Sequence, residues 1–267
     1  MSAVATPTAG RVNFWRVFRS EFIKFRSLRT TWVLLGSTVA VMVGLAALFG
    51  FGVVQSEGTE NPVPPQFVKT IATSGGIGFA MLIIASFGAV FIAGEYATGM
   101  IRSTMTAAPG RIAPLVAKAL VMAIAAFLVG IVSAFIAFFV AQPILATKDL
   151  DFPLDTHGVI GSIFGGGLFL AIIAVLGLSI GALLRNTPAS VVTVIGLLFV
   201  VSIIVELIPL DFFDDLLPYL PDQAGSQMTM IDTQGDTLNQ WQGGLVCLAW
   251  ALVAHIAALV LVKTRDV

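Results

Sequence analysis

Six long runs of apolar residues, separated by polar segments, make up most of the chain. Each run approaches or exceeds the roughly 20 residues that a helix, rising about 1.5 Å per residue, needs to cross a hydrocarbon core of about 30 Å. Strands that cross a membrane are much shorter, so runs of this length favour helices. The sequence therefore predicts an all-α polytopic membrane protein with six transmembrane helices, over residues 31–54, 75–94, 119–141, 158–184, 189–208 and 243–262.

The overall composition agrees with this prediction. Hydrophobic residues make up 57% of the chain and charged residues only 11%, which lies outside the usual range of soluble domains. The first apolar run is too long for the core of a cleaved signal peptide, so we expect it to be retained as a span. Cys247 is the single cysteine and lies within an apolar run, so no internal disulfide is expected.

Basic residues are distributed unevenly among the segments that connect the runs. Twelve of the fourteen Lys and Arg residues precede the first run, follow the last, or lie between runs two and three or four and five. Only Lys69 and Lys148 lie on the other side, where most acidic residues are found. Positive charge marks the cytoplasmic side, so both termini are predicted to be cytoplasmic. We divide the chain into a cytoplasmic N-terminal segment, residues 1–30, and a six-helix transmembrane domain, residues 31–267.

The segment before the first run has the pattern of an amphipathic helix. Its aromatic residues recur at helical spacing, and the sequence predicts that most of its arginines lie opposite them. Glu21 interrupts the apolar face, and Lys24 lies at i+3, where it can pair with that carboxylate. This pattern predicts a basic amphipathic helix on the inner membrane surface, with aromatic residues Phe14, Trp15, Phe18, Phe22 and Phe25 and basic residues Arg16, Arg19 and Arg26.

The polar connection between the second and third runs is long for a simple turn. Thr98 and Gly99 are expected to end the second span, and residues 101–108 to form a short helix. Pro109 and Gly110 give a turn signal before the third span. A short helix on the cytoplasmic side suits the binding of a soluble partner.

With these features the chain resembles the type-2 permease family of ATP-binding-cassette (ABC) transporters. The resemblance rests on the six spans, the basic amphipathic segment with Glu21 and Lys24, and the residues that close the second span and open the third. It implies that the N-terminal segment is an elbow helix and that residues 95–111 form a coupling loop seated on an ATPase subunit. The elbow residues are then Phe14, Trp15, Arg19, Glu21, Lys24 and Arg26, and the coupling residues Glu95, Tyr96, Gly99, Arg102, Pro109, Arg111 and Lys118.

The chain carries no phosphate-binding loop of the type G-x-x-x-x-G-K-[ST], and no Gly is followed directly by Lys. We therefore expect a permease that is not itself an enzyme, binds no cofactor or metal, and has no nucleic-acid partner. The resemblance implies a cytoplasmic ATPase subunit that binds ATP and magnesium, and a second permease in the same bilayer, either another copy of this chain or a related permease. It also implies export, with an amphiphilic drug, peptide or lipid as the substrate.

The connection between the fifth and sixth runs, residues 209–242, is acidic and predicted to be extracellular. It contains six aspartates and no basic residue. Phe213, Leu216 and Leu220 fall at helical spacing, which predicts a helix that dips into the outer membrane surface until Pro221 ends it. The resemblance implies that such external helices cover the exit path.

Two other functions use residues inside the apolar runs. Ser179 in the fourth run and His255 in the sixth repeat the span positions of the dyad in rhomboid intramembrane proteases. Packing of small residues is the simpler explanation for Gly177, Ser179 and Gly181, and likewise for Gly161 and Gly165. His255 and Glu206 are also candidate groups on a substrate path, because ionisable residues within membranes are costly. The structural alternative is that His255 hydrogen-bonds a neighbouring helix and Glu206 reaches the outer interface beside Pro209. A proton relay through them would make the chain an ion-coupled secondary transporter.

Overall fold

The computed structural model describes residues 13–107, 112–231 and 237–264, and within these ranges the chain forms helices and no strand. Six helical stretches are long and apolar enough to cross a membrane. The predicted all-α fold with six spans is confirmed, and the chain is a polytopic membrane protein. The spans are α2 (Arg29–Ser56), α3 and α4 (Pro65–Ser74 and Ile77–Ala97), α6 (Ile112–Leu145), α7 (Val159–Leu184), α8 to α9 (Thr187–Ile195 and Val201–Leu207) and α12 (Gln240–Thr264).

The fourth span, α7, lies at the centre of the bundle. It packs against α4, α6 and α12, and it is the most deeply buried of the six spans. A Cβ atom on Gly177 would collide with the carbonyl oxygen of Ala85, so glycine allows α4 and α7 to approach closely. The predicted small-residue packing is confirmed there and at Gly165, which touches Met228, but it is wrong for Gly161, beside which the structure has open space.

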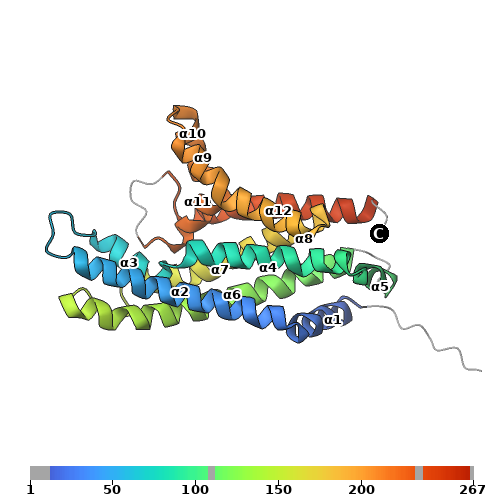
Figure 1. Ribbon diagram of the computed structural model, residues 1–267, viewed down its shortest axis with the longest axis horizontal. Coiled ribbons are helices and arrows are strands. Elements are labelled where there is room, and N and C mark those ends of the chain that lie inside the picture. Colours follow the sequence, from blue (N-terminus) through green and yellow to red (C-terminus); the bar gives the residue numbers. More distant parts are fainter. Residues whose placement is uncertain (1–12, 108–111, 232–236, 265–267) are drawn as a thin grey trace, which may run out of the picture.

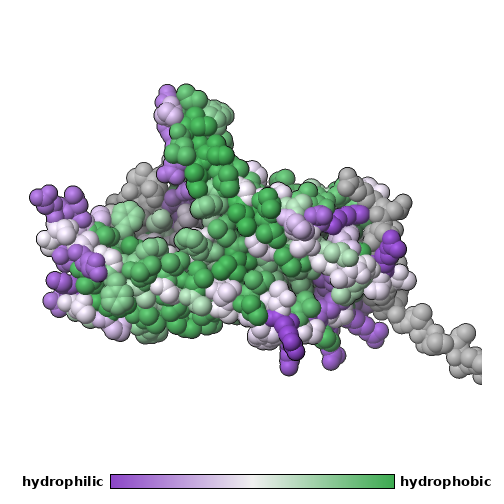
Figure 2. Space-filling view, viewed as in Figure 1, coloured by the Kyte–Doolittle hydropathy of each residue, from purple (hydrophilic) through white to green (hydrophobic). Residues whose placement is uncertain are grey.

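One end of the bundle gathers the segments that carry the basic charge. The N-terminal helix α1 (Phe14–Ser27), the short helix α5 (Met100–Ala107) and the last turn of α12 all lie at this end (Figure 1). Leu28 separates α1 from α2, because its backbone is extended. The predicted amphipathic and short helices are therefore both present. Polar residues cover the two ends of the molecule, while the middle of the visible face is apolar (Figure 2).

The fifth span departs from the bundle along its length. A π-helical turn, η2 (Gly196–Val200), joins α8 to α9, and α9 and α10 (Asp211–Leu216) project away from the other helices (Figure 1). The projecting surface is apolar, with 73% of Leu207 and 69% of Phe212 exposed (Figure 2). This arrangement leaves much of the apolar surface of α9 and α10 exposed, although Ser202 of α9 donates to Asp222 Oδ1 of α11 (Pro221–Ser226) at 2.7 Å.

The segment after α10 turns back into the bundle. The helical segment expected before Pro221 is present as α10 followed by a 3-10 turn, and it ends at Leu220, whose backbone is extended. Pro221 then opens a further helix, α11, which is buried. Gly225 lies against Phe169 of α7 and Cys247 of α12. The remaining short helices are 3-10 turns: η1 (Ala146–Lys148), η3 (Leu217–Tyr219) and η4 (Gln227–Thr229).

Candidate functional site

Four charged side chains from three helices meet near the basic end of the bundle. The Lys118 ammonium of α6 donates to Glu21 Oε2 at 2.6 Å and to Glu95 Oε1 at 2.8 Å. The Lys24 ammonium of α1 donates to Glu21 Oε1 at 2.8 Å and to Glu95 Oε1 at 3.2 Å. The predicted pairing of Glu21 with Lys24 is confirmed. We call Glu21, Lys24, Glu95 and Lys118 the charge cluster.

The charge cluster is almost completely withdrawn from solvent. The side chains of Lys118 and Glu21 are each 1% exposed and that of Glu95 is 7% exposed, while Lys24 remains 29% exposed. A buried charge is tolerated only when it is paired and hydrogen-bonded. Two carboxylates and two ammonium groups balance here, and Lys118 Nζ also lies 4.1 Å from the centre of the Phe91 ring.

The position of Lys24 at the edge of the cluster affects its protonation. Burial alone would lower the pKa of Lys24, but the hydrogen bond and charge of Glu21, together with the charge of Glu95, raise it overall. The folded protein therefore holds Lys24 as a cation more firmly than the unfolded chain does.

The face that α1 turns toward the bundle follows from its sequence. Val17, Glu21 and Phe25 recur every fourth residue and are the buried positions of this helix. Val17 packs against Ala117 of α6, and the Phe25 ring lies 5.7 Å from the ring centre of Phe87 on α4. Glu21 thus enters the bundle between two apolar contacts, which fix it opposite the helices that carry its partners.

The short helix α5 is attached to the charge cluster. Lys24 Nζ also donates to Thr104 Oγ1 of α5 at 3.1 Å. Ile101 is buried, whereas Arg102 is exposed on the surface of the same helix. Gly99 joins α4 to α5 with a φ of 72°, a left-handed conformation that favours glycine. Helix α5 therefore presents Arg102 outward while it contacts the cluster on its inner side.

The end of α4 has a second contact with the end of α7. The guanidinium of Arg185 lies 5.0 Å from the centre of the Tyr96 ring. Arg185 follows the last residue of α7 and adopts a left-handed conformation, with φ of 54°. The same turn of α4 therefore contacts the end of α7 through Tyr96, and it contacts α1 and α6 through Glu95.

The residues expected to act in coupling fall into different environments. Glu95, Tyr96 and Lys118 have their polar or charged ends inside the bundle, and Arg102 is exposed. Pro109 and Arg111 lie outside the described residues.

In the elbow helix, Phe14, Trp15 and Arg26 are exposed. The expectation that Arg19 lies opposite the aromatic residues is wrong, because it lines a groove together with Trp15 and Phe22. These residues follow or precede Arg19 by three or four positions, and that spacing places them on one helix face.

The structure also brings Ser179 and His255 together. Ser179 Oγ lies 3.0 Å from His255 Nδ1, and it donates to the carbonyl oxygen of Val175 at 2.6 Å. Since the single hydroxyl hydrogen is directed to Val175, His255 Nδ1–H is the donor toward Ser179. Glu206 is exposed on α9 and forms no hydrogen bond or ion pair with any residue that the structure describes. His255 and Glu206 are not joined into a relay.

Comparison with protein-family models and with curated proteins finds no match to this chain. The charge cluster is the arrangement that sequence reasoning missed, although it recognised Glu21 with Lys24 and singled out Glu95 and Lys118 separately. The available signal was that Glu21 interrupts an apolar face, while Glu95 and Lys118 lie at the ends of apolar runs. A charge in an apolar setting needs a partner, so these positions indicate that their side chains pair with one another.

Proposed function

We propose that the chain is the permease subunit of an ABC exporter and lies in the cytoplasmic membrane with both termini inside. The observation that carries the proposal is the attachment of an exposed short helix, α5, to a buried charge cluster that joins α1, α4 and α6. In this arrangement, a force applied to α5 from outside the membrane would reach α1, α4 and α6 together. The six spans and the amphipathic α1 agree with this function.

In the proposed mechanism, the ATPase subunit binds the surface of α5 that carries Arg102. Closure of two ATPase subunits on ATP and magnesium pushes α5, and the permease changes its access from one side of the membrane to the other. The buried residues Glu95 and Lys118 then act as positioning residues behind α5 rather than as contacts with the ATPase. An amphiphilic drug, peptide or lipid is the proposed substrate class, because apolar helix surfaces suit molecules with an apolar portion.

A second copy of the permease is part of the proposal. The fifth span exposes 70% of Val192 and 73% of Leu207, and the apolar surface continues onto α10 (Figure 2). A helix that leaves its own bundle can pack against the same helix of another copy, which produces a two-fold interface. The substrate path would then run between the two copies.

The test is affinity purification of the tagged chain from native membranes, with identification of bound soluble ATPases by mass spectrometry. We expect one ABC ATPase to accompany the wild-type chain and to be lost from Arg102→Glu, because the substitution reverses the charge on the exposed face of α5. Arg26→Glu is the matched control, since Arg26 is equally exposed but lies on α1. Transport by the purified chain without an ATPase would contradict the proposal and favour an ion-coupled secondary transporter.

The contact between Ser179 and His255 supports a second candidate, a rhomboid-like intramembrane serine protease. Its geometry is less suited to catalysis, because Ser179 is fully buried near the C-terminal end of α7 and its hydroxyl hydrogen is directed at its own helix. Small-residue packing accounts for the same contact without chemistry. Proteolysis of a membrane substrate by the purified chain, abolished by Ser179→Ala, would establish this activity in place of the permease.

A further inference from the structure

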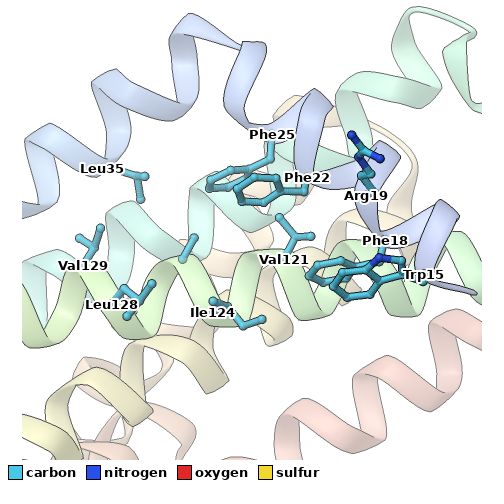
Figure 3. Close-up of a pocket in the computed structure, with 11 residues that line it drawn as sticks. Trp15, Phe18, Arg19, Phe22, Phe25, Leu35, Val121, Ile124, Leu128 and Val129 are labelled. Atoms are coloured by element: carbon cyan, nitrogen blue, oxygen red, sulfur yellow. The ribbon is translucent and has the colours of Figure 1, made fainter.

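An apolar groove lies between the N-terminal helix and the spans beside it (Figure 3). It has a volume of about 670 Å³, and side chains of α1, α2 and α6 line it. On the α6 side the lining runs from Val121 to Val129, which is about 12 Å along the helix. Ile124 and Leu128 on this wall are 49% and 55% exposed. In a polytopic membrane protein such exposed apolar residues face the hydrocarbon of the bilayer.

A single charged side chain interrupts this apolar lining. Arg19 lines the groove together with Trp15, Phe18, Phe22 and Phe25, and its guanidinium points away from the aromatic rings (Figure 3). Arg19 forms no hydrogen bond or ion pair with any residue that the structure describes, and all four members of the charge cluster are paired among themselves. The groove therefore combines an apolar channel with one uncompensated cation.

We propose that this groove binds an anionic phospholipid, with an acyl chain along α6 and the phosphate at Arg19. The apolar walls alone would not select an occupant, because the tails of every lipid are as apolar as the protein surface. Selection comes from the guanidinium, whose planar donors match the oxygens of a phosphate. Aromatic residues beside a basic residue on an amphipathic helix also suit the level of the headgroups. This site is independent of any ATPase partner.

Trp15 supplies a reporter at the site. The chain has four tryptophans, and replacing Trp32, Trp241 and Trp250 by Phe leaves Trp15 as the only one. The purified protein in a neutral detergent is titrated with phosphatidylglycerol or phosphatidylcholine that carries bromine on its acyl chains, and quenching of Trp15 fluorescence is measured. We expect saturable quenching by both lipids, with phosphatidylglycerol binding about fivefold more tightly, the preference that one basic residue near anionic lipid provides.

Three substitutions distinguish binding in the groove from general attraction by surface charge. Arg19→Gln should abolish the preference for phosphatidylglycerol, whereas Arg16→Gln should retain it, because Arg16 is exposed on the same helix but does not line the groove. Ala125→Phe should prevent saturable quenching by filling the channel beside α6. Equal binding of the two lipids, or an equal effect of the two arginine substitutions, would overturn the proposal.

Native mass spectrometry of the otherwise unchanged chain provides a second measurement that does not depend on the tryptophan replacements. We expect phosphatidylglycerol to remain bound to the wild-type protein and to Arg16→Gln after detergent removal, and to be reduced about fivefold on Arg19→Gln. Retention of phosphatidylglycerol by Arg19→Gln at the wild-type level would contradict the assignment of its phosphate to Arg19. Because neither measurement requires ATP or transport, a failure here leaves the proposed permease function unaffected.

Discussion

Replacement of Lys118 by Met tests whether the charge cluster acts as one unit. Lys118 is 1% exposed and donates to Glu21 and Glu95 at 2.6 and 2.8 Å. Met has a similar length and keeps the apolar part of the side chain, but it leaves two buried carboxylates with Lys24 as their only cation. Removing one partner of a buried ion pair lowers the free energy of unfolding by about 3–5 kcal/mol. We expect a loss of this size for Lys118→Met.

The second substitution, Glu21→Gln, removes one carboxylate and leaves Lys24 and Lys118 to share Glu95. We expect it to lower the free energy of unfolding by about 3 kcal/mol, the low end of the range for a broken buried pair. When both substitutions are combined, Lys24 and Glu95 remain as a balanced pair at 3.2 Å. The double variant should therefore lose about 3–5 kcal/mol in total, no more than Lys118→Met alone.

The measurement is a double-mutant cycle, with unfolding followed by circular dichroism as sodium dodecyl sulfate is added to mixed micelles. The predicted interaction between the two substitutions is about 3 kcal/mol, at the upper end of values for residues in contact. Glu57→Gln is the control, because Glu57 is exposed on the opposite end of the bundle and should change stability little. If the losses of the two single variants add to within about 0.5 kcal/mol, Glu21 and Lys118 are not energetically coupled, and the reasoning fails.

Two further predictions concern helix packing and pH. Gly177→Leu should reduce the yield of folded protein in gel filtration far more than Gly161→Leu, because a side chain at Gly177 meets the backbone of Ala85 and Gly161 faces open space. Equal effects would show that α4 and α7 are not in close contact. The raised pKa of Lys24 means that its contribution to stability is complete below its unfolded pKa of about 10.5 and is lost only as pH rises through the higher folded value. The difference in melting temperature between wild type and Lys24→Met should therefore be constant from about pH 6 to 9, and a difference that shrinks across this range would contradict the ion pair with Glu21.

The sequence was sufficient to predict features that depend on local periodicity or on run length. The six spans, the amphipathic α1 and the short α5 follow from such patterns, and the Glu21 to Lys24 pair follows from i, i+3 spacing. Hydropathy does not report which helices touch, so it could not reveal that Lys118 contacts a carboxylate 97 residues away. For the same reason the apolar run of the fifth span gave no sign that it leaves the bundle.

Two local features could be predicted from the sequence only in part. The helical spacing predicts that most arginines of α1 lie opposite its aromatic residues, but Arg19 borders the groove that these residues line. Pro221 predicts the end of the helical segment before it, which does stop at the extended Leu220, but proline is also favoured in the first turn of a helix, where no backbone donor is needed, and there it opens α11. In both cases the local sequence is compatible with more than one arrangement, and contacts with other parts of the fold determine which one forms.

The burial of the charge cluster bears on how α5 can move in the proposed mechanism. A balanced, buried set of charges is weak evidence for stability, because apolar residues of the same size often serve as well, but it requires its members to keep their partners. Helices α1, α4 and α6 are therefore expected to move together, since separating any one of them would leave a charge unpaired in an apolar environment. Helix α5 is joined to this unit by the Gly99 turn, the buried Ile101 and the bond from Lys24 to Thr104. Force applied at Arg102 would therefore pass to the cluster through the two inner contacts of α5, whereas loss of those contacts would let α5 swing about Gly99 without moving the spans.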